Sequence, residues 1–177
     1  MRDCEFSGTR GTLATSVENL ALDFEEHPMP SPVPGYRAAR WLYLRKVPLL
    51  PHIIQGLNHL VFRCYIPYKA AIGENFKVGY SGFGIVVHQG AKIGKDVFLA
   101  HEVTLGGRGG PDRQGVPTIE DGAYVAAGAK ILGAIVVGSG ALVAPNAVVI
   151  GSVPARCIVA GVPARIAREN INVKDYT

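Results

Sequence analysis

The chain has 177 residues, 48% hydrophobic and 18% charged, which predicts one domain with a buried core and excludes a chain that is disordered throughout. Cys4, Cys64 and Cys157 are odd in number and far apart, so we expect neither a disulfide scaffold nor a paired-cysteine metal site, and interpret them as reduced, cytosolic thiols. The net charge of +4 is uneven: residues 1–30 hold six acids and two arginines, whereas 27–73 hold six Lys or Arg and no acid.

The first 35 residues are acidic and then rich in proline. Proline at positions 28, 30, 32 and 34 removes amide donors and fixes φ, so we expect 1–35 to be an extended, mobile lead-in. Residues 1–26 contain six acids and no long apolar run, so no signal peptide is visible and we expect a cytoplasmic protein.

Residues 36–64 are predicted to be helical in two pieces, broken at Pro48 and Pro51. Apolar residues of the second piece form one helical stripe: Ile53, Ile54, Leu57, Leu60, Val61 and Cys64. Facing away from this stripe are His52, Gln55, His59 and Arg63. The acid-free stretch can attract phosphate, a membrane surface or an acidic glycan, or can be a solvated helix face. We expect no nucleic-acid partner and leave membrane association open.

Residues 65–160 repeat with a period of six. An aliphatic residue marks thirteen positions: Ile66, Ile72, Val78, Val87, Ile93, Leu99, Leu105, Ile119, Val125, Ile131, Val137, Val143 and Val149. A second inward candidate follows four positions later: Ala70, Phe76, Ala91, Val97, Val103, Ala123, Ala129, Ile135, Ala141, Ala147 and Val153. This period predicts short strands separated by turns, with three strands in each coil of a parallel β-helix. The uncharged segment 131–155 then belongs to the coils and is not a membrane span.

Two interruptions of the repeat mark the candidate site. Three extra residues separate Val78 from Val87, and eight separate Leu105 from Ile119, which creates the loop 107–118. A solenoid accepts insertions at its corners, and such loops often build its binding face. Residues 161–177 are predicted to be a C-terminal tail.

Several segments resemble the hexapeptide-repeat acyltransferases, close to the serine acetyltransferase branch. The resemblance runs from Tyr36 to Arg168 and rests on WLYLRKVPLLPHIIQGLNHLVFR, GYSGFGIVVHQGAKIG, VTLGGRGG, AAGAKILG and AGVPARI. It implies a left-handed parallel β-helix of hexapeptide repeats with a short N-terminal helical segment, which forms a homotrimer and uses acetyl-CoA or another acyl-CoA. No metal is expected.

The sequence also departs from that branch. Tyr80 or Ser81 stands where the branch has a catalytic histidine, Tyr65 stands near an expected aspartate, and the long loop has no histidine. These departures favour O-acetylation of a sugar, a polysaccharide precursor or a similar small molecule. Serine O-acetylation in cysteine biosynthesis is the alternative.

Acyl transfer to a hydroxyl needs a base for the hydroxyl proton and a donor for the tetrahedral oxyanion. Histidine is the usual base near neutral pH, and of five histidines only His88 and His101 lie on the repeat. Counting hexads places Tyr80 and His101 at one corner and His88 beneath Gly106 at another. Both histidines are candidate bases and Tyr80 a candidate partner for the acceptor, although each can also be a turn or packing residue. Glu102 follows His101, and the pair resembles the base of some sugar-nucleotide N-acetyltransferases of the superfamily.

In a threefold assembly we expect the corner of Tyr80 and His101 to face His88 and the loop of a neighbouring subunit. Candidate cofactor-binding residues are small residues above His101 and nearby cations: Gly107, Arg108, Ala126, Ala127, Gly128, Lys130, Ala144 and Arg165. Each cation can also be an ordinary surface charge. A γ-carbonic-anhydrase-like metalloenzyme would need three histidines per zinc, and a non-catalytic β-helix scaffold is the remaining alternative.

Overall fold

The computed structural model describes residues 30–109 and 115–176. The described helices and strands all lie within one compact unit, Ser31–Thr177. Most of the predicted lead-in and the middle of the predicted loop, residues 110–114, lie outside the described residues.

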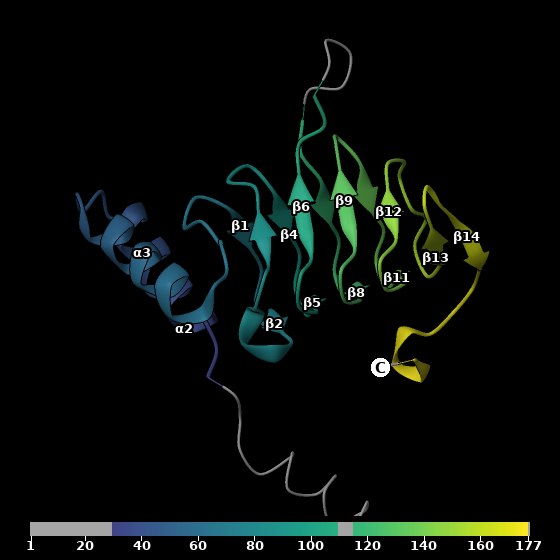
Figure 1. Cartoon of the computed structure of the whole chain (residues 1–177), viewed down its shortest axis with the longest axis horizontal. Coiled ribbons are helices and arrows are strands. Elements are labelled where there is room, and N and C mark those ends of the chain that lie inside the picture. Colours follow the sequence, from purple (N-terminus) through teal and green to yellow (C-terminus); the bar gives the residue numbers. More distant parts are fainter. Residues whose placement is uncertain (1–29, 110–114, 177) are drawn as a thin grey trace, which may run out of the picture. The chain divides into compact units, whose positions relative to one another are not determined.

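Twelve short parallel strands stack into coils, as the period of six predicts. They are β1 (Ala71–Ile72), β2 (Lys77–Val78), β3 (Val86–Val87), β4 (Lys92–Ile93), β5 (Phe98–Leu99), β6 (Thr104–Gly106), β7 (Thr118–Ile119), β8 (Tyr124–Val125), β9 (Lys130–Leu132), β10 (Val136–Val137), β11 (Leu142–Val143) and β12 (Val148–Val149). Every third strand joins the same sheet, so β1-β4-β7-β10, β2-β5-β8-β11 and β3-β6-β9-β12 form three faces (Figure 1). This confirms the parallel β-helix.

The register places equivalent hexad positions above one another. Val78 pairs with Leu99, Leu99 with Val125, and Val87 with Leu105, as hexad counting predicts. All predicted inward residues are buried except Val78, which is partly exposed and packs against the core. The interior is therefore one continuous aliphatic column, and the segment 131–155 belongs to it.

The C-terminal end differs from the predicted tail. Strand β13 (Ile158–Gly161) turns through Val162 and Pro163 into β14 (Ala164–Arg168), which pairs with it antiparallel at the edge of the sheet containing β11. A 3₁₀ turn, η2 (Val173–Asp175), follows. The predicted boundary at residue 160 therefore cuts through a hairpin that ends the sheet.

Helix α2 (Val33–Leu44) begins three residues earlier than predicted, inside the proline-rich segment. Proline in the first helical turn removes an amide that has no partner within the helix anyway, which makes this start possible. The Tyr36 hydroxyl donates to the Ala70 carbonyl at 2.7 Å, and the Arg37 guanidinium donates to the Ile72 carbonyl at 2.8 Å. Helix α2 thus covers carbonyl groups at the first coil, where the sheet would otherwise have an open edge.

Helix α3 (Leu50–Phe62) contains Pro51 in its first turn, so the break between the helices lies at residues 45–49 and not at Pro51. The polar face of α3, and not its apolar stripe, contacts the rest of the unit. Gln55 accepts from the Tyr68 amide at 3.3 Å, and the His52 ring lies 3.0 Å from the Tyr68 hydroxyl, so polar side chains of α3 attach it to the rest of the unit. The apolar stripe is largely exposed. No helix among the described residues is long and apolar enough to cross a membrane.

Candidate active site

The predicted corner of Tyr80 and His101 exists. Tyr80 opens the insertion between β2 and β3, which forms the 3₁₀ turn η1 (Tyr80–Gly82), and His101 lies one coil above in the turn between β5 and β6. The two rings meet edge to face, with their centroids 4.9 Å apart and their planes at 79°. Tyr80 itself is 66% exposed, so its hydroxyl is accessible while its ring contacts the histidine.

His101 has an unusual environment for a turn residue. Its Nδ1 atom is buried and has no hydrogen-bond partner among the described residues. An unpaired buried polar atom costs about 1–3 kcal/mol, which packing alone does not explain. Burial of Nδ1 leaves Nε2 as the nitrogen that can exchange a proton with a substrate.

Glu102 follows His101 in the chain, but no hydrogen bond joins their side chains among the described residues. Its amide donates to the Phe83 carbonyl at 2.8 Å, and its own carbonyl accepts from Lys130 Nζ at 2.6 Å. A Cβ added to Gly84 would come within 2.9 Å of the Glu102 Cγ, so glycine permits the close approach of the two turns. These contacts fix the backbone of the corner, and the side chain of Glu102 is exposed.

His88 lies at the other edge of the sheet β3-β6-β9-β12. The Gly90 amide donates to His88 Nδ1 at 3.1 Å, so a neutral His88 carries its proton on Nε2. In this tautomer His88 can donate a hydrogen bond but cannot act as a base through Nε2. The geometry therefore separates two histidines that sequence reasoning treats alike.

A hollow of about 370 Å³ lies along this sheet beside His88. Tyr65, Gln89 and Thr104 also line it, and none of them is among the site residues predicted from the sequence. Thr104 could have been found by counting, because it is the outward neighbour of the inward residue Leu105. Gln89 carries no such signal.

The two histidine corners are separated within one chain. They flank the same sheet, and β6, with a rise of about 3.3 Å per residue over its three residues, lies between them. No hydrogen bond joins the two histidine side chains within the described residues, so the corners are two separate positions on one chain.

The candidate cofactor residues fall into three places. Ala126, Ala127, Gly128 and Ala144 continue the His101 corner upward, and the Gly128 amide donates to the His101 carbonyl at 3.0 Å. Gly107 and Arg108 follow β6 at the opposite edge, whereas Arg165 lies on β14, opposite Ala160. Of these candidates, Gly128 and Lys130 contact the backbone of His101 and Glu102, respectively, and the two arginines lie elsewhere in the fold.

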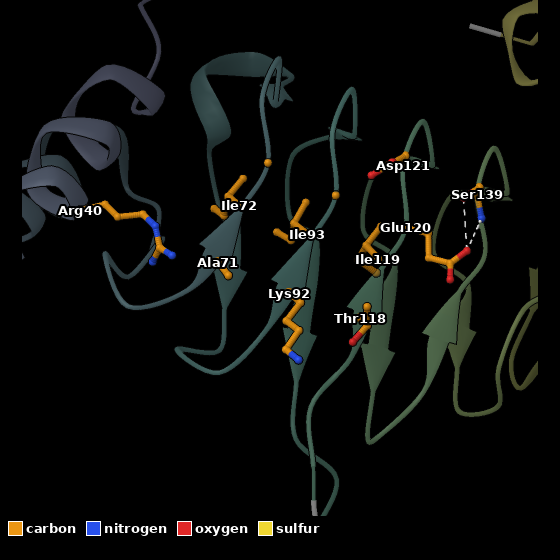
Figure 2. Close-up of a pocket in the computed structure, with 12 residues that line it drawn as sticks. Arg40, Ala71, Ile72, Lys92, Ile93, Thr118, Ile119, Glu120, Asp121 and Ser139 are labelled. Carbon is orange, nitrogen blue, oxygen red and sulfur yellow. Dashed lines mark hydrogen bonds between the residues drawn. The ribbon is translucent and has the colours of Figure 1, made fainter. Parts of the chain in front are cut away.

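Another hollow, of about 630 Å³, lies on the sheet β1-β4-β7-β10 beside helix α2 (Figure 2). Its carboxylates are engaged in the turns, as Figure 2 shows for Glu120, which accepts from the Ser139 amide at 2.9 Å. Asp121 likewise accepts from the Lys95 amide at 2.8 Å. These acids satisfy turn amides, so we do not place the chemistry here. No group of three His, Cys, Asp or Glu positioned for a metal occurs in the described ranges.

Three sheets of two- and three-residue strands, with histidines at the corners, define a parallel β-helix of the hexapeptide-repeat class. No family model matches the chain. It is 41% identical over 134 residues to the serine acetyltransferase of Escherichia coli strain K12. The matched residues make up 75% of this chain and 48% of that protein. The chain is 37% identical over 136 residues to the serine acetyltransferase of Bacillus pumilus, covering 77% and 62%.

Among solved structures, the serine acetyltransferase of Brucella abortus strain S19 in complex with coenzyme A matches with a TM-score of 0.70 and 37% identity, over 78% of this chain and 55% of that one. In sequence and in fold, the chain is similar to the hexapeptide-repeat acyltransferases of the serine acetyltransferase branch over about three quarters of its length. It spans about half to three fifths of the length of these three relatives.

Proposed function

We propose that the chain is an acetyl-CoA-dependent O-acetyltransferase. The observation that carries this proposal is the corner where exposed Tyr80 packs edge-on against His101, whose Nδ1 is buried and unpaired among the described residues. Relatives of this fold are serine acetyltransferases, and one is solved with coenzyme A. A histidine with one accessible ring nitrogen provides the base that attack of a hydroxyl on a thioester requires.

In the proposed reaction His101 Nε2 accepts the proton of the acceptor hydroxyl as its oxygen attacks the acetyl carbonyl carbon. The Nε2–H of His88 donates to the oxyanion that forms. Collapse of the tetrahedral intermediate breaks the carbon–sulfur bond, and the coenzyme A thiolate leaves and takes the proton from His101. The acetyl ester forms directly, with no covalent enzyme intermediate.

The two histidines can cooperate if the protein is a homotrimer with its sites between subunits. A threefold ring uses two different surfaces of each copy, so one corner of a subunit can face the other corner of its neighbour. The separation of the corners within one chain supports this arrangement. The hollow beside His88 would then receive the acceptor or the pantetheine arm.

Serine is the first acceptor to test, because the relatives are serine acetyltransferases. A sugar hydroxyl is the second candidate. It is favoured by the aromatic side chains of Tyr65 and Tyr80, which are 41% and 66% exposed and offer a flat surface with a polar tip to a ring-shaped acceptor.

An acetyl-CoA thiol-release assay with serine and a panel of sugars tests the proposal. We expect acceptor-dependent release that His101→Ala reduces, with serine and the sugars ranked by kcat/KM. Release that does not depend on any acceptor, or no release with the whole panel, would contradict the proposed activity and favour a scaffold.

A further inference from the structure

The exposed stripe of helix α3 is the surface feature that the proposed activity does not use. It consists of Leu49, Leu50, Ile53, Leu57, Leu60 and Val61, which we call the apolar helix face. Leu49 is 73% exposed, Leu60 67% and Val61 68%. From Leu50 onward the spacing of three and four residues puts these side chains along one side of the helix. Contiguous apolar patches of this kind on a surface mark interaction sites.

The opposite side of α3 already attaches the helix to the rest of the unit. Asn58 donates to the Pro32 carbonyl at 2.9 Å, and His59 Nδ1 lies 3.1 Å from the Cys64 carbonyl. Gln55 and His52 bond to Tyr68 on the same side. The polar residues therefore hold the helix in place, and the apolar residues are directed outward. This orientation would be costly if water were their only surroundings.

Charges of one sign frame the apolar helix face. Arg45 and Lys46 lie in the turn before α3, and Arg63 ends the helix at its other end. The described stretch 30–73 contains no Asp or Glu. Trp41 lies in α2, is 52% exposed and stacks under the Arg45 guanidinium at 3.8 Å. Apolar residues, an accessible tryptophan and a cationic border are the composition of helices that lie in the plane of a membrane surface.

From the apolar helix face and its cationic border, we propose that α3 binds the surface of an anionic lipid bilayer. The helix lies flat, with its leucines in the acyl boundary and Arg45, Lys46 and Arg63 at the anionic headgroups. A second copy paired about a twofold axis fits less well, because such a contact would bring the two cationic borders together. The inference is independent of the acetyltransferase proposal, since it uses none of the same residues.

Co-sedimentation of the full chain with vesicles tests this inference. We expect binding to phosphatidylcholine vesicles that contain phosphatidylglycerol, weak binding to pure phosphatidylcholine, and release by salt. Leu57→Ser with Leu60→Ser should reduce the vesicle partition coefficient by about tenfold or more. Arg45→Gln with Lys46→Gln should reduce it about fivefold per charge, and only on anionic vesicles.

The matched control is Val136→Ser, which changes an exposed aliphatic residue on β10 and should leave vesicle binding unchanged. All variants alter exposed side chains, so thermal melting should show the parent's transition, and binding losses can be assigned to the surface. No binding of the full chain to anionic vesicles would overturn the inference. So would equal binding by the Leu57→Ser, Leu60→Ser variant, or concentration-dependent self-association that this variant abolishes in the absence of vesicle binding.

Discussion

His101 and His88 differ by the partner of one ring nitrogen, and this difference predicts different kinetic roles. His101 Nδ1 is buried and unpaired within the described residues, whereas His88 Nδ1 accepts from the Gly90 amide. His101→Ala should lower kcat by about 10²–10⁴, because the base is lost. His88→Ala should lower kcat by about 10²–10³, because a donor to the oxyanion is lost. The kcat values of His101→Gln and His88→Gln decide between the roles: an amide can donate in place of His88 but cannot act as a base, so His88→Gln should retain part of the activity, and near-parent activity of His101→Gln would assign the base elsewhere.

The buried thiol of Cys64 leads to a separate prediction about how the stability of the fold depends on pH. Burial raises the pKa of the Cys64 thiol to about 11, from a usual value of 9.0. The folded chain therefore retains this proton in a range where the unfolded chain loses it. The contribution of the protonated thiol to the free energy of unfolding is fully present below about pH 9. It is lost as the pH rises towards 11, by at most about 1.4 kcal/mol per pH unit.

Urea unfolding between about pH 8 and pH 11 measures this effect. The free energy of unfolding should fall less steeply in Cys64→Ala than in the parent. Burial also raises the pKa of Tyr36, so some loss at the upper end should persist in the variant. Identical slopes for parent and variant would show that the thiol does not contribute.

At the scale of elements, two glycines with different surroundings provide a matched pair. Gly84 has φ +70°, and a Cβ there would meet Glu102, whereas Gly56 lies within α3 and a Cβ there would meet nothing within 4 Å. Gly84→Ala should destabilise the fold by about 1–2 kcal/mol, since it adds backbone strain and contact. Gly56→Ala should stabilise it by about 0.5–1 kcal/mol through helix propensity. Thermal melting compares the two, and a neutral Gly84→Ala would mean that the turn can relax.

The coils could be predicted from the sequence because their period of six is fixed by the geometry of the backbone. Once three strands make a coil, the positions of Tyr80 and His101 at one corner follow by counting. Counting could not provide the ring contact between them or the tautomer of His88, because these depend on side-chain rotamers and on one amide. The serine acetyltransferase relatives favour serine over the sugar that the departures at Tyr80 and Tyr65 suggest.

The helices show a different limit of sequence reasoning. The apolar stripe of α3 is correct as a pattern, but a pattern does not say which side of a helix meets the rest of the protein. Gln55, Asn58 and Tyr68 decide this through hydrogen bonds between segments that are not adjacent in sequence. The C-terminal hairpin was missed for a similar reason, since β14 carries no hexad signal and pairs antiparallel at an edge.

At the scale of the whole molecule, the proposed shared cleft predicts complementation between two inactive variants. His101→Ala retains an intact His88 corner, and His88→Ala retains an intact His101 corner. In trimers assembled at random from equal amounts of both, about a quarter of the clefts combine the two intact corners, because each side is intact with a probability of about one half. The mixture should therefore recover about a quarter of the parent's activity.

Co-expression of the two variants with different affinity tags, followed by purification through both tags, isolates the mixed trimers. Each such trimer contains one complete cleft among its three, so its activity should approach a third of the parent's, while either variant alone stays about a hundredfold or more below the parent. Sedimentation equilibrium should give the mass of a trimer for parent and variants alike. If the mixed trimers are no more active than the mean of the two variants, both histidines act within one subunit. In that case the bound substrates would have to reach from the His101 corner to the His88 corner of the same subunit, across strand β6.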